Sequence, residues 1–395
     1  RGATGLVGAA LLVMTVAGCS MGPWGSGSGE PSPTGATSVA GPSTRTPASA
    51  SSTASPDAAC SAKASSMSLS AQVQTLYMGA ITQAAPSAAA NELGQQMVGS
   101  VILMTDPGSM NAAAALTGAL RAQDPDVLIS VDQEGGEVTR LNGSGFTRIP
   151  SAAEQAGQSA DRIRSDWAGW AGELDRAGVD YNLAPVADVV TADMASANQP
   201  IGQLGRGYGQ TAADVTADAG AAIAGMHDSD VLTSIKHFPG LGAVTANTDY
   251  AAATDSTTTA DSDAVRVFAD LSGSTDSVMI GSAIYQQIDP GGPAVFSSTI
   301  ITDLLRNRIG YGGVVVSDDL GSAVALEDYP AAERGTLFLR AGGDLALDVD
   351  PSTVNSMVQN TITAAQSDRE FAARITDKAS RVLSLKQRAG VISCS

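Results

Sequence analysis

The sequence predicts an α/β fold, specifically a TIM-type (β/α)8 barrel that forms a single catalytic domain. Short apolar runs alternate with helical patterns between residues 67 and 390, and this alternation is typical of parallel strands joined by crossover helices. Seven or eight such units fit a barrel, whose usual size is about 250 residues plus insertions. A doubly wound open sheet is the main alternative, but no glycine-rich nucleotide-binding motif follows the first predicted strand.

The predicted strands are short runs of β-branched or aliphatic residues. They span residues 100–105, 127–131, 179–185, 231–235, 277–281, 313–316 and 344–349. Helical patterns lie between or after them, at residues 161–177, 212–227, 261–271, 299–308 and 369–388. In the first of these patterns Ile163, Trp167, Trp170 and Leu174 recur at three- to four-residue spacing, which predicts an amphipathic helix.

The N-terminal segment has the pattern of an export signal. Arg1 precedes a short apolar run at residues 6–18, which ends at Cys19, and a positive charge, an apolar run and small residues occur in this order in a signal peptide. The run is short for a membrane-spanning helix, which needs about 20 apolar residues. Residues 16–19, VAGC, resemble a bacterial lipobox, in which the cysteine carries a lipid. An ordinary secretory signal with an incidental cysteine is the alternative.

The next segment predicts a tether and an extracytoplasmic location. Residues 20–59 are mostly Ser, Gly, Pro, Thr and Ala, a composition that cannot bury enough surface to offset the entropy of ordering. We therefore expect a signal peptide with lipobox at 1–19, a disordered tether at 20–59 and the barrel domain at 60–395. The lipid would anchor the protein to the cell membrane, facing the cell wall.

The two remaining cysteines, Cys60 and Cys394, bracket the predicted domain. In an oxidising compartment such a pair invites a disulfide, because barrel folds bring the chain ends together; two free thiols are the alternative. The chain carries 22 basic and 40 acidic residues, a net charge of −18, which argues against nucleic acid as a partner. No cluster of His, Cys and carboxylates has metal-ligand spacing in the sequence, so we expect neither a metal nor a cofactor.

Polar and charged residues follow directly after several predicted strands. The stretches are VDQEGGEVTRL (131–141), NLAPVADV (182–189), IKHFPGLG (235–242), MIGSAIY (279–285) and VVVSDDL (314–320). One Asp in such a position could cap a helix. A barrel, however, brings the carboxyl ends of its strands to one face, where active sites of this fold lie. The set therefore predicts a catalytic site.

Four motifs closely resemble the family 3 glycoside hydrolases: VDQEGGEVTRL, GFTRIPSA (145–152), KHFPG and SDDL. The single-domain β-N-acetylglucosaminidase branch of that family is the most similar, over residues 66–391. The resemblance implies a retaining mechanism in which Asp318 is the nucleophile that forms a covalent glycosyl-enzyme. For the neighbouring Asp319, the expected role is to cap a helix that begins near Leu320.

The resemblance also implies which residues bind the terminal sugar of the carbohydrate substrate. A carboxylate such as Asp132 can accept two hydrogen bonds from adjacent hydroxyls. Arg206 lies in GRGYG, where two residues more than in the family pattern precede it. For Arg140 the alternative is a salt bridge with Glu134 or Glu137. The predicted sugar-binding residues are Asp132, Arg140, Arg206, Lys236 and His237.

The family pattern breaks where its acid/base residue is expected. That branch carries a second His after KHFPG and then Asp-Ser-His, whereas this chain has Leu241 and then Asn-Thr-Asp at 247–249. Asp249 holds the place of the last His. Either Asp249 is the acid/base, or another group supplies the proton, or the protein only binds sugars. We favour the first hypothesis because the nucleophile and the sugar-binding residues are retained. The other histidine, His227, ends a helical pattern and is expected to interact with the helix C-terminus.

The leading hypothesis is an exo-acting, retaining β-N-acetylglucosaminidase that removes terminal N-acetylglucosamine from peptidoglycan-derived or related glycans. We expect it to act as a monomer. A β-glucosidase of the same family and a non-catalytic, sugar-binding envelope lipoprotein are the alternatives.

Overall fold

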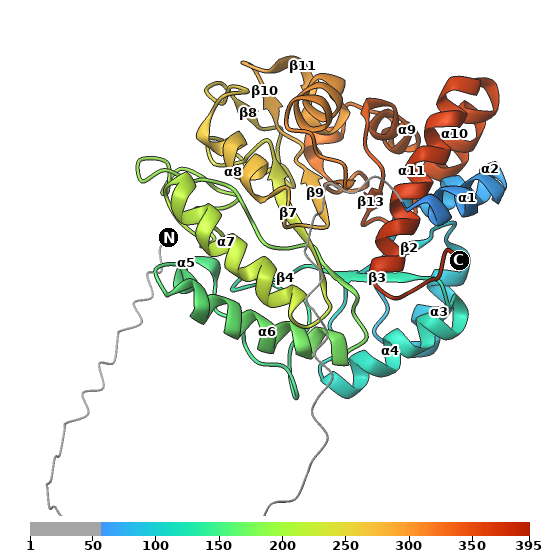
Figure 1. Ribbon diagram of the computed structural model, residues 1–395, viewed down its shortest axis with the longest axis horizontal. Coiled ribbons are helices and arrows are strands. Elements are labelled where there is room, and N and C mark those ends of the chain that lie inside the picture. Colours follow the sequence, from blue (N-terminus) through green and yellow to red (C-terminus); the bar gives the residue numbers. More distant parts are fainter. Residues whose placement is uncertain (1–56) are drawn as a thin grey trace, which may run out of the picture. The chain divides into compact units, whose positions relative to one another are not determined.

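Eight parallel strands form one sheet at the centre of this computed structural model, which describes residues 57–395 (Figure 1). The order of the strands in the sheet follows their order in the chain. They are β1 (Tyr77–Ile81), β2 (Ser100–Leu103), β3 (Leu128–Val131), β6 (Tyr181–Asn182), β7 (Leu232–Phe238), β9 (Ser277–Ile280), β12 (Val314–Ser317) and β13 (Ala346–Asp348).

The sheet closes on itself between β12 and β13. Ser317 N donates to Leu345 O at 3.1 Å, and Leu320 N donates to Leu347 O at 2.9 Å. The last strand also pairs in parallel with the first, with Ala346 opposite Tyr77. Because first and last strands meet, the sheet is a barrel with no free edge. The predicted TIM-type α/β fold is therefore confirmed.

Helices cover the outside of the barrel, and every connection between barrel strands contains at least one (Figure 1). Helices α6 (Ala160–Arg176) and α7 (Ala212–His227) lie side by side. The side chains of Ser159 and Thr211, which precede them, accept backbone N–H groups of the first helical turns. These bonds satisfy donors that a helix start leaves free. The helices are α1 (Ala58–Ser66), α2 (Leu69–Thr75), α3 (Pro86–Gln95), α4 (Met110–Gln123), α5 (Ala152–Gln155), α6 (Ala160–Arg176), α7 (Ala212–His227), α8 (Asp263–Leu271), α9 (Ala331–Ala341), α10 (Val354–Ser367) and α11 (Arg369–Arg388), with the 3-10 helices η1 (Ala294–Phe296) and η3 (Val324–Leu326) and the π-helix η2 (Thr299–Arg308).

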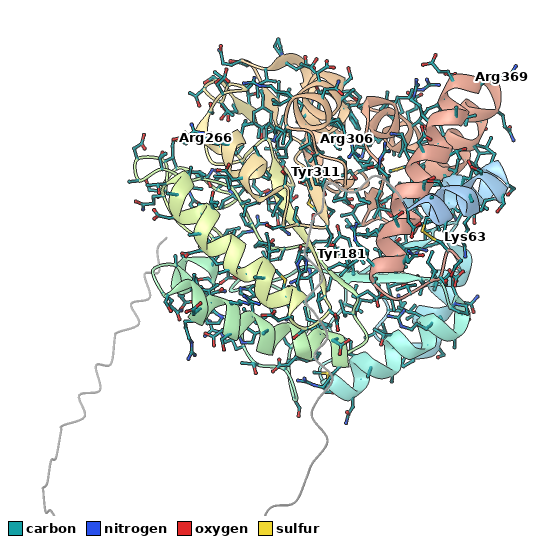
Figure 2. All side chains as sticks on the ribbon, viewed as in Figure 1. Lys63, Tyr181, Arg266, Arg306, Tyr311 and Arg369 are labelled. Atoms are coloured by element: carbon teal, nitrogen blue, oxygen red, sulfur yellow. A yellow bond between two sulfur atoms is a disulfide. The ribbon has the colours of Figure 1, made fainter. Side chains whose placement is uncertain are left out.

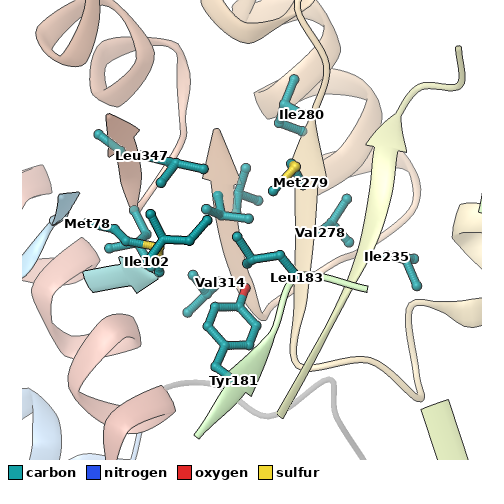
Figure 3. Packing of buried hydrophobic residues seen from close by; sticks show 14 of the residues in the cluster. Met78, Ile102, Tyr181, Leu183, Ile235, Val278, Met279, Ile280, Val314 and Leu347 are labelled. Carbon is teal, nitrogen blue, oxygen red and sulfur yellow. The ribbon is translucent and has the colours of Figure 1, made fainter. Parts of the chain in front are cut away.

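Buried side chains of the strands pack against one another in the core, including Met78, Ile102, Val278 and Val314 (Figure 3). Tyr181 is fully buried there, and its hydroxyl is hydrogen-bonded to the Ser277 hydroxyl, as a buried phenol requires. Such burial stabilises a fold by about 25 cal/mol per Å² of apolar surface. The barrel is thus a packed core, and a ligand site can form only at one of its ends.

Additional short strands lie in the loops that follow the C-terminal ends of the barrel strands. β4 (Gln133–Gly135) and β5 (Val138–Thr139) form a hairpin directly after β3. At Gly135, φ is +96° and an added Cβ would lie 2.3 Å from the carbonyl oxygen of Pro150. Only glycine fits this turn, which explains one glycine of the DQEGG motif. β8 (Thr254–Asp255), β10 (Ile284–Tyr285) and β11 (Asp289–Pro293) form a second small sheet after β7 and β9.

Most element boundaries agree with the sequence, with a few corrections. The predicted helices at 212–227 and 369–388 coincide with α7 and α11, whereas the segment at 299–308 is a π-helix. The predicted strand at 179–185 is wrong in length, since only two of its residues form β6. The sequence does not predict β1, because Gly79 interrupts its apolar run and α2 precedes it without a loop of any length.

The two ends of the described chain meet. Cys60 in α1 and Cys394 are joined by a disulfide, and Lys63 Nζ donates to Ser393 O at 2.9 Å beside it (Figure 2). None of the helices within residues 57–395 is both long and apolar enough to cross a membrane. The signal peptide, Cys19 and nearly all of the expected tether lie outside the described residues.

Candidate active site

A cleft of about 720 Å³ opens at the C-terminal ends of the barrel strands. Its walls come from the segments that follow β3, β6, β7, β12 and β13. All seven residues for which the sequence predicts catalysis or sugar binding line this cleft: Asp132, Arg140, Arg206, Lys236, His237, Asp249 and Asp318. The structure thus brings together residues that are up to 186 positions apart (132 to 318) in the chain.

Two cations and two carboxylates form a paired cluster in the buried part of the cleft. Lys236 Nζ lies 2.6 Å from Asp132 Oδ1 and 2.6 Å from Glu134 Oε1. Arg206 donates two hydrogen bonds, each 2.8 Å long, to the two carboxylate oxygens of Glu134. Fork-to-fork pairs of this kind fix both side chains in place. The cluster therefore presents a rigid, charged surface to a ligand.

Electrostatics keep this cluster charged despite its burial. Burial alone would raise the pKa of Glu134, but the attraction of Arg206 and Lys236 is stronger and holds that pKa well below its usual range. Burial likewise disfavours the charged form of Lys236, yet Asp132 and Glu134 raise its pKa above the ordinary value. Glu134 is therefore ionised at neutral pH and cannot serve as a proton donor.

A fully buried aspartate orients His237. Asp188, which follows β6, lies with Oδ2 2.8 Å from His237 Nδ1, and its Oδ1 accepts the Leu241 N–H at 2.7 Å. The other ring nitrogen, Nε2, lies 3.5 Å from the Arg206 guanidinium at the cleft. A carboxylate on one ring nitrogen fixes the ring orientation and favours the proton on that side. His237 is thus held in position at the cleft, with Nε2 beside Arg206.

Asp318, the predicted nucleophile, follows β12 directly. Its backbone N–H donates to Ile280 O at 2.9 Å, and its Oδ1 accepts the Asp319 N–H at 2.9 Å. Burial raises the pKa of Asp318 to about 6; the charge of His237 lowers it, and the charge of Asp249 raises it. Unlike Glu134, this carboxylate has no ion-pair partner within 4.0 Å among the described residues. It is therefore an ionised but poorly neutralised group at neutral pH, as a nucleophile should be.

Asp249 lies on an exposed loop at the rim of the same cleft. The loop is a turn in which Asn247 Oδ1 accepts the Asp249 N–H at 3.0 Å. Its backbone is attached to the segment after β12, because Ala325 N donates to Thr248 O at 3.1 Å. Asp249 is near enough to Asp318 for the two carboxylates to repel each other. The loop therefore holds a second carboxylate against the predicted nucleophile.

The expected helix cap at Asp319 is wrong, because no helix begins near Leu320. Instead, Asp319 Oδ1 accepts the N–H groups of Gly321, at 2.8 Å, and of Val349, at 2.9 Å. Its other oxygen accepts the N–H of Ser322 at 2.8 Å. Asp319 thus joins the loop that carries the nucleophile to the end of β13, and it is a positioning residue.

Arg140 forms neither of the salt bridges considered as alternatives. Glu134 pairs with Arg206 and Lys236 instead, and the buried Nε of Arg140 has no hydrogen-bond partner among the described residues. A donor in this state at a cleft wall is available to a ligand. The other histidine, His227, lies outside the cleft lining and bonds through Nε2 to Asp276 Oδ2 at 2.8 Å rather than to its own helix end.

Sequence reasoning missed two functional residues, Glu134 and Asp188. Glu134 is the third residue of DQEGG and was considered only as a partner for Arg140, because charge alternation does not tell which cation a carboxylate will meet. Asp188 is the last but one residue of the strand-end stretch NLAPVADV. An acidic residue at the end of an apolar strand, on the predicted catalytic face, was the available signal in both cases.

The fold and the site together define a barrel with a charged cleft at the C-terminal ends of its strands, where enzymes of this fold have their active sites. Charged groups already paired with one another are suited to hydroxyl groups, which can join such pairs without disturbing their charge balance. Two carboxylates from different segments line this cleft, Asp318 half-buried and Asp249 on an exposed loop, and glycoside hydrolysis uses a pair of carboxylates.

Comparisons with known proteins agree with this class. The glycosyl hydrolase family 3 N-terminal domain matches residues 68–385, and the chain therefore belongs to this family of glycoside hydrolases. A β-hexosaminidase of Pseudomonas aeruginosa is 37% identical over 237 residues, covering 59% of this chain and 69% of that protein. A β-hexosaminidase of Methylococcus capsulatus is 31% identical over 287 residues, covering 70% of this chain and 83% of that protein.

A solved structure is also similar to this chain. The crystal structure of a β-N-acetylhexosaminidase from Beutenbergia cavernae has a TM-score of 0.78 with this structure and is 40% identical. The match covers 81% of this chain and 99% of that chain. The similarity therefore extends over most of this chain and nearly all of that one.

Proposed function

We propose that the protein is an exo-acting, retaining β-N-acetylglucosaminidase with Asp318 as nucleophile and Asp249 as acid/base. Its substrates would be peptidoglycan-derived or related glycans that end in N-acetylglucosamine. The observation that carries the proposal is that Asp318 and Asp249 line one cleft and interact through their charges. The β-hexosaminidase relatives support an N-acetylhexosamine as the terminal sugar.

The paired cluster would bind the terminal sugar. Asp132 and Lys236 can exchange hydrogen bonds with neighbouring hydroxyls, and Arg140 has a free donor at the wall. The packed barrel lies beneath the cluster, which supports a site that takes only the last sugar of a glycan, as an exo-acting enzyme would.

The two carboxylates would then divide the chemistry. Asp318 attacks the anomeric carbon and forms a glycosyl ester, while Asp249 gives its proton to the glycosidic oxygen, so that the bond to the aglycone breaks. In the second half of the reaction Asp249 takes a proton from water, which attacks the anomeric carbon and releases Asp318. Repulsion between the carboxylates favours a state in which one is protonated and the other ionised.

The location is also part of the proposal. The apolar run that ends at Cys19 supports export and attachment to the cell membrane through a lipid. The protein would then act as a monomer in the space between the membrane and the cell wall. Metabolic labelling with a fatty-acid analogue, with Cys19→Ser as control, tests this part.

The test of the activity uses 4-nitrophenyl β-N-acetylglucosaminide. We expect release of 4-nitrophenol by the native protein, its loss in Asp318→Ala, and unchanged release in Asp270→Ala, which removes an exposed carboxylate on α8 away from the cleft. Mass spectrometry after reaction with a slow fluorinated glycoside should find the sugar on Asp318.

Two outcomes would contradict the proposal. Faster hydrolysis of the corresponding glucoside would identify a β-glucosidase. Tight binding of N-acetylglucosamine without turnover of any β-glycoside would identify a sugar-binding protein.

A further inference from the structure

Tyr250 is much more exposed to solvent than the other large hydrophobic residues of the described chain. Within residues 57–395 it is the single large hydrophobic residue left exposed, with 78% of its surface open to solvent. It lines the cleft and follows Asp249 directly. An exposed aromatic ring at the rim of a ligand cleft is typical of a contact surface, since aromatic rings combine a large apolar face with a polar edge.

The backbone that carries Tyr250 is held in place. Tyr250 N donates to Asn247 O at 3.0 Å, and Ala251 N donates to the same oxygen at 3.0 Å. Thr248, two residues before it, is buried, and its carbonyl oxygen accepts the Ala325 N–H. A ring on an ordered turn costs less entropy to immobilise on a ligand than one on a free segment.

The order of groups along the cleft places this ring on the leaving-group side. The buried cluster around Lys236 is suited to the terminal sugar, and Asp318, directly after β12, lines the same cleft. An acid must reach the glycosidic oxygen, so the aglycone begins where Asp249 stands. Tyr250 follows Asp249 at the exposed rim and is therefore next to the aglycone.

The opposite wall supplies polar partners. Gln199 and Gln203, from the segment between β6 and α7, line the same cleft as Tyr250. Amide side chains both donate and accept hydrogen bonds, so they suit the hydroxyl edge of a sugar. A pyranose chair has an apolar C–H face and a polar edge, and the lining of the cleft offers an aromatic ring for the first and amides for the second.

We propose that Tyr250 forms an aglycone subsite, where its ring stacks on the C–H face of the pyranose that carries the terminal sugar. The proposal rests on the proposed glycosidase function and adds its substrate class, a β-linked disaccharide or longer glycan. Simple aryl or alkyl glycosides would use the subsite only in part.

The test compares two substrates that share the terminal sugar. Methyl β-N-acetylglucosaminide has no aglycone ring but needs the same general acid, whereas N,N′-diacetylchitobiose places a second pyranose at the rim. The measured quantity is the ratio of kcat/KM for the disaccharide to kcat/KM for the methyl glycoside. We expect this ratio to fall about tenfold in Tyr250→Ala, which is about 1.4 kcal/mol of lost binding.

Two further variants separate stacking from other effects. Tyr250→Phe retains the ring and should keep the ratio within about twofold, whereas Tyr250→Leu retains apolar area without a flat face and should lose about fivefold or more. An unchanged ratio in Tyr250→Ala would overturn the proposal. So would an equal loss on both substrates, which would indicate that Tyr250 only shapes the loop around Asp249.

Failure of the proposed function has a different signature. A native protein that hydrolyses neither substrate is not a glycosidase for this sugar, whatever Tyr250 does. In that case calorimetry measures the affinities of the disaccharide and of the monosaccharide, first for the native protein and then for Tyr250→Ala. The difference between the two affinities tests the subsite. A preference of about tenfold for the disaccharide that disappears in Tyr250→Ala supports the subsite, and no preference overturns it.

Discussion

At the residue scale, the cleft shows how neighbours assign different roles to identical chemical groups. Glu134 and Asp318 line the same cleft, but Glu134 has two cations within hydrogen-bond distance and Asp318 has none within the described chain. Their pKa values consequently move in opposite directions. The neutralised carboxylate can bind, and the poorly neutralised one can react.

Replacing Asp318 with Asn should stabilise the fold at about pH 7.5 by about 1–3 kcal/mol, because a buried carboxylate of raised pKa disfavours the folded state when it is ionised. The sign follows from the two pKa values, about 6 when folded and about 4 when unfolded. The penalty is absent below about pH 4, grows up to about pH 6 and is complete above it. Urea unfolding of the native protein and of Asp318→Asn, at about pH 4 and at about pH 7.5, measures the gain in the free energy of unfolding. A gain of the same size at both ends would show that charge is not its cause.

Replacing Asp249 with Ala should lower kcat on an unactivated glycoside by about a hundredfold or more, since general acid catalysis contributes about 10²–10⁴. On an activated aryl glycoside, whose leaving group departs without a general acid, azide should restore turnover and yield a β-glycosyl azide, because this small anion attacks the glycosyl-enzyme and needs no general base. The matched variant Asn247→Ala disturbs the same turn without removing a carboxylate, and azide should not change its rate. Unchanged turnover in Asp249→Ala would remove this residue from the mechanism.

At the element scale, an aspartate with the same bonding pattern recurs at the N-terminal ends of three barrel strands. Asp180, Asp276 and Asp344 each precede a strand, and each accepts the backbone N–H of a neighbouring strand, at 2.8 to 2.9 Å. Each also pairs with an arginine. These aspartates therefore fix the start of β6, β9 and β13 against the adjacent strand. Their position, opposite the cleft, fits a role in stability rather than catalysis.

The ion pairs of Asp344 allow a direct test of this stabilising role. Its carboxylate bonds to Arg306 and Arg381, and Arg306 lies over the Tyr311 ring, 5.7 Å from its centroid (Figure 2). Asp344→Ala removes the buried carboxylate that two partly buried arginines share, so we expect a loss of about 3–5 kcal/mol in the free energy of unfolding by urea. Asp270→Ala, on the surface, should stay within about 0.5 kcal/mol. Equal effects of the two variants would refute the role of the pair.

At the scale of the whole molecule, the barrel and the two ends of the described chain, residues 57–395, are tied together. The disulfide between Cys60 and Cys394 spans 334 residues. Asp57, at the other side of α1, bonds to Gln387 and Ser384 of α11. Neither cysteine lines the cleft. The terminal helices therefore hold the chain ends together without taking part in the site.

Removing this disulfide should lower the free energy of unfolding by about 2–5 kcal/mol, because a cross-link over a long loop restricts the unfolded chain. The variant is Cys60→Ser with Cys394→Ser, measured by thermal or urea unfolding. Activity below the melting range should be unchanged. Reducing agent should destabilise the native protein and leave the double variant unaffected; destabilisation of both would point to another cause.

Much of the fold and of the site could be predicted because their signals are local. The period of apolar residues gave the helices α7 and α11, and the charged strand ends placed Asp132, Lys236, His237 and Asp318 on one face. The strand β1 and the short β6 could not be predicted, because their identity depends on the strands that pair with them. The cap assigned to Asp319 failed for the same reason, since its partner Val349 is 30 residues away.

The sequence alone determined the alternation of strands and helices, the polar residues at the strand ends and the family to which the chain belongs. Only the tertiary structure decided which carboxylate meets which cation: Glu134 binds Arg206 and Lys236, and Asp188 binds His237. It also decided that Asp249 and Asp318 line the same cleft and that Tyr250 is exposed there. Such pairings require side chains from distant strands to meet in one low-dielectric cleft, and no local pattern encodes that meeting.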